Sequence, residues 1–196
     1  MFEKVEEFEK EIAKFYGAPY AVAVDCCTHG IELCLRYKKI TRVSCPKNTY
    51  LSIPMTFEKL GLEWHFDNDN WQDFYYLKSS NIIDAAVLWK ENSYIANTLM
   101  CLSFQFKKHL SLGRGGAILC ETYEDYIALK KMSYDGRMPN EPWEGQNIDT
   151  IGYHYYITPE TAMLGLEKLP LAIATKSNRR DWTTYPDLSK LKVFNK

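Results

Sequence analysis

"LSFQFKKHLSLGRGGAIL", residues 102–119, is the stretch that decides the fold of this protein. Its first apolar residues alternate as in a β-strand, and they are followed by two lysines, Lys107 and Lys108, and a glycine-rich turn. A buried ammonium group is costly unless a partner pairs with it or a reaction uses it. The two lysines are therefore either solvated surface groups or functional groups, and the rest of the sequence has to distinguish these alternatives.

Short apolar runs alternate with amphipathic segments on both sides of this stretch. The run "PYAVAVD", residues 19–25, is continuous, as in strands covered on both faces of a parallel sheet. Further strands are expected at residues 42–46, 62–66, 81–89, 98–104 and 115–120, and helices at residues 2–17, 28–39, 51–60, 122–132 and 158–169. Pro170 should break or kink the last helix. This order predicts one α/β domain over residues 1–196 with a mostly parallel sheet.

The composition excludes several functions. The net charge of −1 gives no electrostatic footprint for nucleic acid or an anionic membrane. No apolar run is long enough to span a bilayer. The six cysteines lack the spacing of a zinc site, so we expect no metal and, instead, free thiols in a reducing, cytoplasmic environment.

Four polar or aromatic positions stand out beside the lysines. Asp84 lies at the end of an apolar strand, where ligands of parallel sheets gather, and its burial requires a cationic partner. Thr28 lies where a helix starts after a strand, which is either an anion site or a simple helix cap. Tyr50 and Ser103 also follow or end strands, and ordinary packing is the alternative for Tyr50. Together these groups suit pyridoxal 5′-phosphate, because a lysine, a carboxylate, an aromatic ring and a phosphate-binding helix start are what that cofactor uses.

The sequence resembles the DegT/StrS sugar-nucleotide aminotransferases, which are pyridoxal-phosphate enzymes of fold type I. The most specific motif is "S-F-x-x-x-K-x-L-x-x-G-x-G-G", which residues 103–116 match position by position. Residues 46–50 match "P-x-x-T-[FWY]", residues 84–86 match "D-A-A", and residues 17–30 are similar to the family's "G-x-x-x-A-V-x-V-x-S-G-T" segment. The resemblance implies a three-layer α/β/α fold with a mostly parallel sheet, the fold type I large domain in reduced form.

The resemblance also implies roles for individual residues. Lys108, not Lys107, is implied as the Schiff-base residue, with Asp84 at the pyridine nitrogen and Tyr50 stacked on the ring. The phosphate is implied to lie at Ser103 and at the helix start of Cys27 and Thr28. His154 stands where the family has the asparagine of "G-x-N-x-R", which reaches the phosphate from the neighbouring subunit, so a homodimer with a shared active site is implied.

The sequence departs from the family in several places. We expect a chain that lacks the C-terminal small domain, and the stretch between residues 66 and 81 is short, as if one strand–helix unit were deleted. Val87 replaces the usual His or Gln, and residues 26–27 replace Ser-Gly. The parts that hold the cofactor are thus expected to be retained and the parts that close over the substrate to be reduced.

We therefore expect a pyridoxal-phosphate-dependent aminotransferase that moves an amino group from an amino acid to a keto-sugar nucleotide. Two alternatives remain open. The first is a pyridoxal-phosphate enzyme that acts on a small amino acid without a nucleotide. The second is a reduced, non-catalytic paralogue that serves as a partner subunit.

Overall fold

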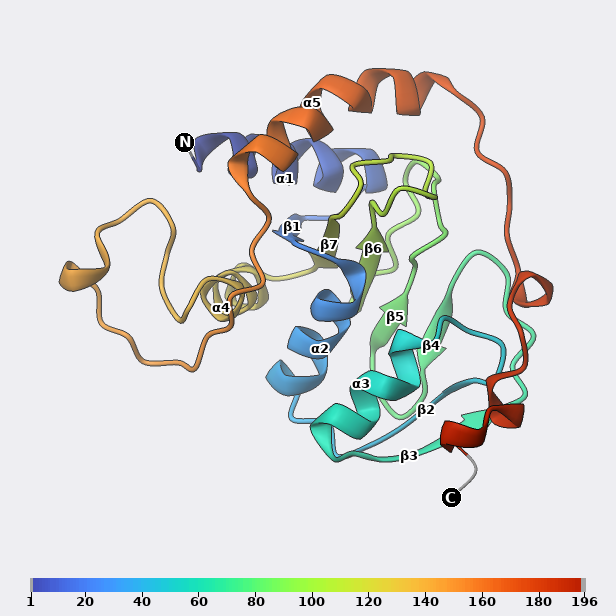
Figure 1. Ribbon diagram of the computed structural model, residues 1–196. Coiled ribbons are helices and arrows are strands. Elements are labelled where there is room, and N and C mark those ends of the chain that lie inside the picture. The colour runs from blue at the N-terminus through green and yellow to red at the C-terminus, as the bar shows by residue number, and fades with distance from the viewer. Residues whose placement is uncertain (1, 195–196) are drawn as a thin grey trace.

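The computed structural model describes residues 2–194 of the 196-residue chain. These residues form five α-helices and seven strands, whose arrangement can be followed in Figure 1. The helices are α1 (Glu3–Tyr16), α2 (Cys27–Tyr37), α3 (Ser52–Leu60), α4 (Tyr123–Ser133) and α5 (Pro159–Ala174). The strands are β1 (Tyr20–Val24), β2 (Arg42–Pro46), β3 (Glu63–Asp67), β4 (Tyr75–Leu77), β5 (Ile82–Asp84), β6 (Leu99–Ser103) and β7 (Gly116–Cys120). Short 3₁₀ turns lie at Trp143–Gly145, Trp182–Thr184, Leu188–Lys190 and Lys192–Phe194.

The main sheet has the strand order β1-β7-β6-β5-β4, and β2 and β3 form a separate parallel pair. β5 and β6 are parallel, whereas β7 runs antiparallel to both of its neighbours and β4 runs antiparallel to β5. β1, β5 and β6 therefore share one direction, with β7 and β4 reversed among them. The expected α/β class is confirmed, and the sheet is mixed because two reversed strands interrupt the parallel set.

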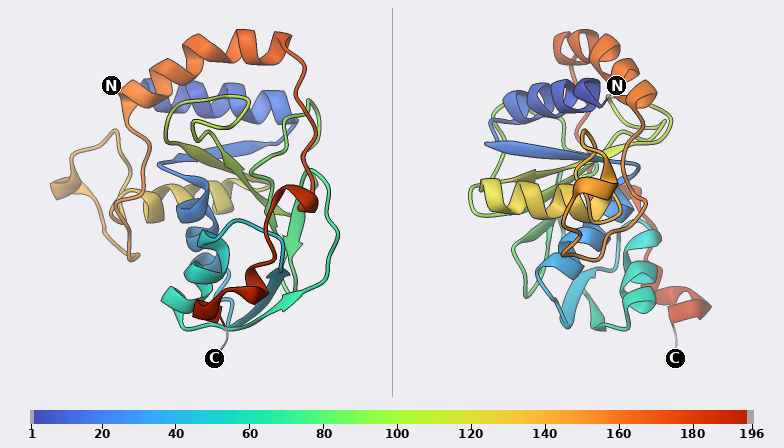
Figure 2. Two further views of the ribbon diagram at one scale, coloured as in Figure 1. Left: turned by 45° about the vertical axis from the view of Figure 1, so that its right-hand side comes forward. Right: turned by 90° about the vertical axis from the view of Figure 1, so that its left-hand side faces the viewer.

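Helices cover both faces of the main sheet (Figures 1 and 2). Successive side chains of a strand point to opposite faces, so Ala21 and Ala23 of β1 pack into the cluster beneath α1 and α5. Val22 and Val24 pack into the other cluster, with residues of α2 and α4. The result is the expected three-layer α/β/α arrangement, with one hydrophobic core on each side of the sheet.

A buried ion pair joins three of these elements. Glu9 of α1 accepts hydrogen bonds from the Lys130 ammonium of α4 at 2.6 Å and from the Ala23 backbone N–H of β1 at 2.7 Å. Glu9 and Lys130 are both almost fully buried. Burial raises the pKa of Glu9, and the charge of Lys130 opposes that rise. The pair therefore places α1 and α4 relative to β1.

Most expected elements are present, with three differences. The apolar run 81–89 contributes only the short strand β5, because the chain turns after Asp84. β4 was not expected from the sequence. A break or a kink was expected at Pro170, and α5 continues through it to Ala174, so the helix does not break there. Pro170 is exposed, and the carbonyl of Ala172 bonds to the Trp89 indole N–H at 3.2 Å, which holds the helix beyond the proline.

Two expectations from composition can be compared with the structure. All six cysteines are free, as expected. Within residues 2–194, no helix combines the length and the apolar character that crossing a membrane requires.

The C-terminal segment, defined as residues 175–194, returns from α5 toward β2 and β3 along one side of the molecule (Figure 1). Isolated bridges join Asp181 to Gln72 and Asp187 to Asn48. Near its end, the ring of Phe194 packs edge-on against Trp64 of β3, with centroids 5.7 Å apart. This path carries the segment past the ends of the strands that bear the candidate site residues.

Candidate active site

The two lysines lie in the loop that joins β6 to β7 and have different environments. The Phe106 N–H donates to the Gly113 carbonyl at 3.0 Å, and Gly113 has a φ of 79°, which glycine adopts without strain. Lys107 is exposed, with its ammonium 5.5 Å from the ring centroid of Phe106. Lys108 is half-buried. One lysine is therefore a solvated group, and the other needs a further explanation.

Lys108 lies where its neutral amine is favoured. Burial lowers the pKa of Lys108, the nearby carboxylate of Asp84 opposes that effect, and the charge of Arg180 adds to it. Within residues 2–194, its Nζ makes neither a hydrogen bond nor an ion pair with a side chain. An amine with a lowered pKa is more often unprotonated at neutral pH and is then a nucleophile.

Asp84 ends β5 as a buried carboxylate held by two donors. The Tyr75 phenol donates to its Oδ2 at 2.5 Å, and the Ala86 backbone N–H donates to its Oδ1 at 2.9 Å. The Tyr75 oxygen also shares a hydrogen bond with the Thr49 hydroxyl. Burial raises the pKa of Asp84, and these donors and the charge of Lys108 oppose the rise. Asp84 is thus a buried acid with a cationic neighbour but no ion pair among the described residues.

The start of α2 lies directly against β7. A side chain at Gly116 would come within 2.6 Å of the Cys27 backbone nitrogen, so the glycine permits this approach. The Cys27 thiol donates to the Cys101 carbonyl at 3.5 Å, and burial raises the pKa of Cys27 well above its usual value. Cys27 therefore offers a backbone N–H rather than a thiolate. The hydroxyls of Thr28 and Ser52 share a hydrogen bond of 2.7 Å, which joins the starts of α2 and α3.

Two tyrosines lie near these groups. Tyr50 precedes α3 and is 59% exposed, so its ring is open to a ligand. Tyr185 of the C-terminal segment was not singled out by the sequence. Burial raises the pKa of Tyr185 to about 12, with a further contribution from the charge of Asp84. The Asn48 side-chain amide donates to the Tyr185 carbonyl at 2.9 Å, which fixes the segment at this point.

A cavity of about 330 Å³ opens beside Lys108. The turn after β5, the lysine loop and the C-terminal segment all contribute to its wall. Its lining residues are Ala86, Val87, Leu88, Trp89, Ser103, Lys107, Lys108, His109, Leu110, Ser177, Asn178 and Arg180. The cavity thus brings Ser103 and Lys108 together, whereas Thr28, Tyr50 and Asp84 lie outside its lining.

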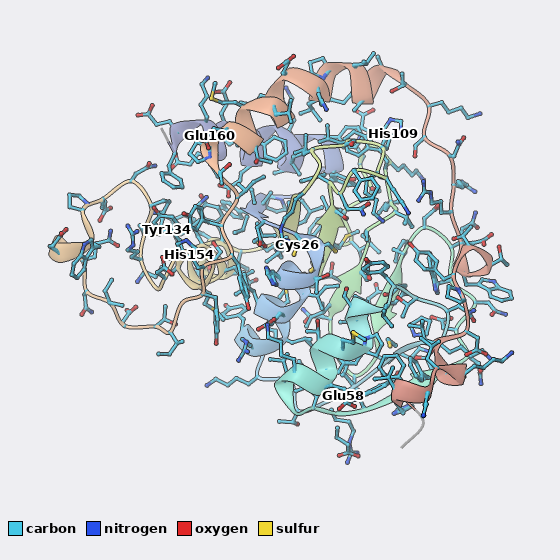
Figure 3. The ribbon with its side chains drawn as sticks, viewed as in Figure 1. Cys26, Glu58, His109, Tyr134, His154 and Glu160 are labelled. Carbon is cyan, nitrogen blue, oxygen red and sulfur yellow. The ribbon has the colours of Figure 1, made fainter. Side chains whose placement is uncertain are left out.

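His154 lies apart from the lysine loop within this chain. It is exposed, with Nδ1 3.1 Å from the Asp135 carboxylate and its ring packed edge-on against Tyr156. Figure 3 shows His154 beside Tyr134 on one side of the molecule and His109, a neighbour of Lys108, on the other. The structure does not bring His154 to the other candidate residues of the same chain.

A second polar cluster ties the lysine loop to the end of β1. The Arg114 guanidinium donates to Asp25 Oδ2 at 2.8 Å, and His29 Nδ1 lies 2.7 Å from Asp25 Oδ1. The His29 ring stacks on Tyr155 at 3.7 Å between centroids. Asp25, Cys26 and His29 are close enough to share a metal ion. Burial lowers the pKa of His29, but the hydrogen bonds and charges of Asp25 and Cys26 outweigh it and raise the pKa to about 9, so in the absence of a metal the protonated imidazole, Asp25 and Arg114 form an ion-pair network.

The residues present fit pyridoxal 5′-phosphate. Lys108 is an amine with a lowered pKa. Asp84 is a buried carboxylate without an ion pair among the described residues, so a cation such as a protonated pyridine nitrogen would neutralise its charge. The backbone N–H groups at the helix start of Cys27 and the hydroxyl of Ser103 can donate hydrogen bonds to a phosphate. Sequence reasoning missed Tyr75, Arg180 and Tyr185, because no motif or periodicity marks them.

Most of the chain matches one protein-family model. A model of the DegT/DnrJ/EryC1/StrS aminotransferase family matches residues 1–74 and 93–190. Residues 75–92 lie outside the match, so the interpretation of Asp84 depends on the geometry above. The spore coat polysaccharide biosynthesis protein SpsC of Bacillus subtilis (strain 168) is 44% identical over 54 residues, which are 28% of this chain and 13% of that protein.

The fold is similar to that of several solved structures. Spr1654 from Streptococcus pneumoniae, in its PLP form, has a TM-score of 0.72 and 18% identity over 87% of this chain. 3-Amino-5-hydroxybenzoic acid synthase has a TM-score of 0.68 and 19% identity over 88% of the chain. DesI, solved with its TDP-sugar product, has a TM-score of 0.69 and 18% identity, again over 88% of the chain. The matches cover 60%, 57% and 54% of those three structures, so the chain spans little more than half of each.

Proposed function

The chain belongs to the DegT/DnrJ/EryC1/StrS aminotransferase family, and we propose that it binds pyridoxal 5′-phosphate at Lys108 and transfers an amino group from an amino acid to a keto-sugar nucleotide. One observation carries the proposal. Lys108 is a half-buried amine whose pKa is lowered by burial, and it lies close enough to the buried carboxylate of Asp84 for the two charges to interact. A structural lysine would instead reach water or form an ion pair, as Lys107 and Lys130 do.

In this proposal each residue has a separate task. The bound cofactor would supply a ring that withdraws electrons from the substrate. Lys108 would hold the cofactor and then move a proton with its neutral amine. Asp84, oriented by Tyr75, would keep the pyridine nitrogen positively charged. Tyr50, whose ring is open, would cover one face of the cofactor ring.

The phosphate of the cofactor would lie at the start of α2. Backbone N–H groups at a helix N-terminus favour an anion, and the Thr28 hydroxyl, which already bonds to Ser52, adds a donor. Cys27 contributes its N–H, and Ser103 contributes a hydroxyl from the end of β6. His154 would add a contact from a second copy of the chain, since it is exposed and apart from its own lysine loop. A homodimer is therefore part of the proposal.

The names of two similar proteins support a sugar-nucleotide acceptor. DesI was solved with a TDP-sugar product, and SpsC is named for polysaccharide biosynthesis. The alternative enzyme, acting on small amino acids alone, would show amino transfer that UDP- or TDP-sugars do not compete with. The alternative of a non-catalytic partner subunit would show no amino transfer to any acceptor.

Borohydride reduction tests the proposal. The full chain is mixed with pyridoxal phosphate, reduced and mapped by peptide mass spectrometry. We expect the label on Lys108 in the wild type and in Lys107→Ala, the matched control, and no label in Lys108→Ala. Label on Lys107, or on neither lysine, would contradict the assignment.

A further inference from the structure

The cavity beside Lys108 is lined by basic groups and by no acidic group among its described lining residues. Lys107, Lys108 and Arg180 line it, together with the imidazole of His109, and none of its described lining residues is Asp or Glu. The rest of the wall is neutral. The positive charges of Lys107 and Arg180 raise the local concentration of anions.

Arg180 is held in place at the edge of this cavity. Its Nη2 donates to the Lys107 carbonyl at 3.2 Å, and its own carbonyl accepts from the Asp73 N–H at 2.9 Å. The guanidinium has five N–H donors, of which the Lys107 carbonyl uses one. Within the described part of the chain Arg180 forms no ion pair, whereas the neighbouring Arg179 lies 3.9 Å from the Asp73 carboxylate.

The size and lining of the cavity favour a small anion. Its volume of about 330 Å³ is at the lower end of the range for ligand pockets, about 300–1,000 Å³. Leu88, Trp89 and Leu110 form an apolar wall, while Ser177 and Asn178 offer hydroxyl and amide groups beside Arg180. This suits a short aliphatic chain that ends in a carboxylate better than a nucleotide with a base, a ribose and a diphosphate.

We propose that Arg180 binds a carboxylate of the amino-acid donor in the cavity beside Lys108, and so determines which donors the protein accepts. The inference rests on the proposed function for its description of the ligand as a donor. The guanidinium fork matches the two oxygens of a carboxylate. Arg180 belongs to the C-terminal segment, so a segment outside the three α/β/α layers completes the site.

Titration calorimetry with glutarate, a dicarboxylate without an amino group, tests the proposal. The full chain is used near neutral pH, with and without added pyridoxal phosphate. We expect saturable binding to the wild type and a loss of about tenfold or more in Arg180→Gln, as for the removal of one charge-assisted hydrogen bond. Arg180→Lys should recover part of the affinity. Arg179→Gln, the matched control, should bind glutarate like the wild type, because Arg179 does not line the cavity.

The outcomes separate this proposal from the proposed function. No saturable binding to the wild type, an equal loss in Arg179→Gln, or no loss in Arg180→Gln would overturn it. A loss of affinity for uridine diphosphate alone in Arg180→Gln would assign the site to the nucleotide and also overturn the carboxylate assignment. Borohydride labelling of Lys108 is independent of these results, so a labelled chain that does not bind glutarate refutes only the inference. An unlabelled chain that binds glutarate refutes the proposed function and the description of the ligand as a donor, but leaves the carboxylate site at Arg180.

Discussion

The Tyr75 phenol donates a 2.5 Å hydrogen bond to the Asp84 carboxylate across the antiparallel pair of β4 and β5. In the ladder the two residues are direct partners. Burial raises the pKa of Tyr75 well above its usual value, so the phenol keeps its proton and acts as the donor. The shortened stretch between β3 and β5 therefore contributes the residue that orients Asp84.

Tyr75→Phe should weaken cofactor binding and change its pH dependence. The lost hydrogen bond favoured the ionised form of Asp84, so the pKa of Asp84, already raised by burial, should rise further. Affinity for pyridoxal phosphate should therefore fall as the pH is lowered, with a midpoint at higher pH in the variant. Absorbance titrations across a pH series measure this. Tyr76→Phe, at an exposed position of the same strand, is the control, and coincident wild-type and Tyr75→Phe profiles would refute the role.

Asp84→Asn should separate stability from cofactor binding. Because the pKa of Asp84 is higher in the folded protein than in the unfolded chain, the folded state holds this proton more tightly. The free energy of unfolding therefore falls as the pH rises from the unfolded-state pKa to the folded-state pKa of Asp84. At neutral pH the amide removes a buried charge, so the unfolding midpoint in urea should be unchanged or higher. Cofactor affinity should be largely lost, because the pyridine nitrogen loses its counter-charge. A variant that binds cofactor normally would show that Asp84 has another role.

Lys130→Met should destabilise the fold by about 3–5 kcal/mol at neutral pH, because it leaves the Glu9 carboxylate buried without its partner. Glu9→Gln combined with Lys130→Met should recover much of this loss. Urea unfolding measures both. Lys131→Met is the control, since Lys131 pairs with Asp149 near the surface at 3.1 Å and should cost at most about 1 kcal/mol. Equal losses in the two single variants would show that burial of the pair is unimportant.

Light scattering and cofactor titration together test the proposed dimer and His154. We expect a dimer mass for the wild type and for His154→Ala, with weaker cofactor binding in the variant. The imidazole N–H can donate a hydrogen bond to a phosphate oxygen, and the variant loses this donor. A monomer mass with cofactor bound, or equal cofactor affinities of the wild type and His154→Ala, would contradict the contact from a second subunit.

The sequence predicts those parts of the site that follow from local pattern. The position of Lys108 in the loop after an apolar strand follows from the motif spacing. The start of α2 at Cys27 is likewise signalled by the end of the preceding strand. In each case, residues that are neighbours in the chain are sufficient to predict the feature.

The remaining parts depend on contacts between distant residues. β4 has three residues, too few for a period to be recognised, and it exists because it pairs with β5. α5 passes Pro170 because Trp89, far away in the chain, bonds to the Ala172 carbonyl. Arg180 reaches the cavity because the segment that carries it is tied to the Lys107 carbonyl and to Asp73. Local propensity contains none of these contacts.

The position of β1 at the edge of the main sheet also has a consequence for synthesis on the ribosome. β1 pairs only with β7 in that sheet, and Val24 is opposite Gly116, 92 residues later. At a translation rate of about 5–20 residues per second, roughly 5–20 s pass between the synthesis of the two strands. During that interval the first strand has no partner in its own chain, and its apolar residues are available to a chaperone or to another nascent chain.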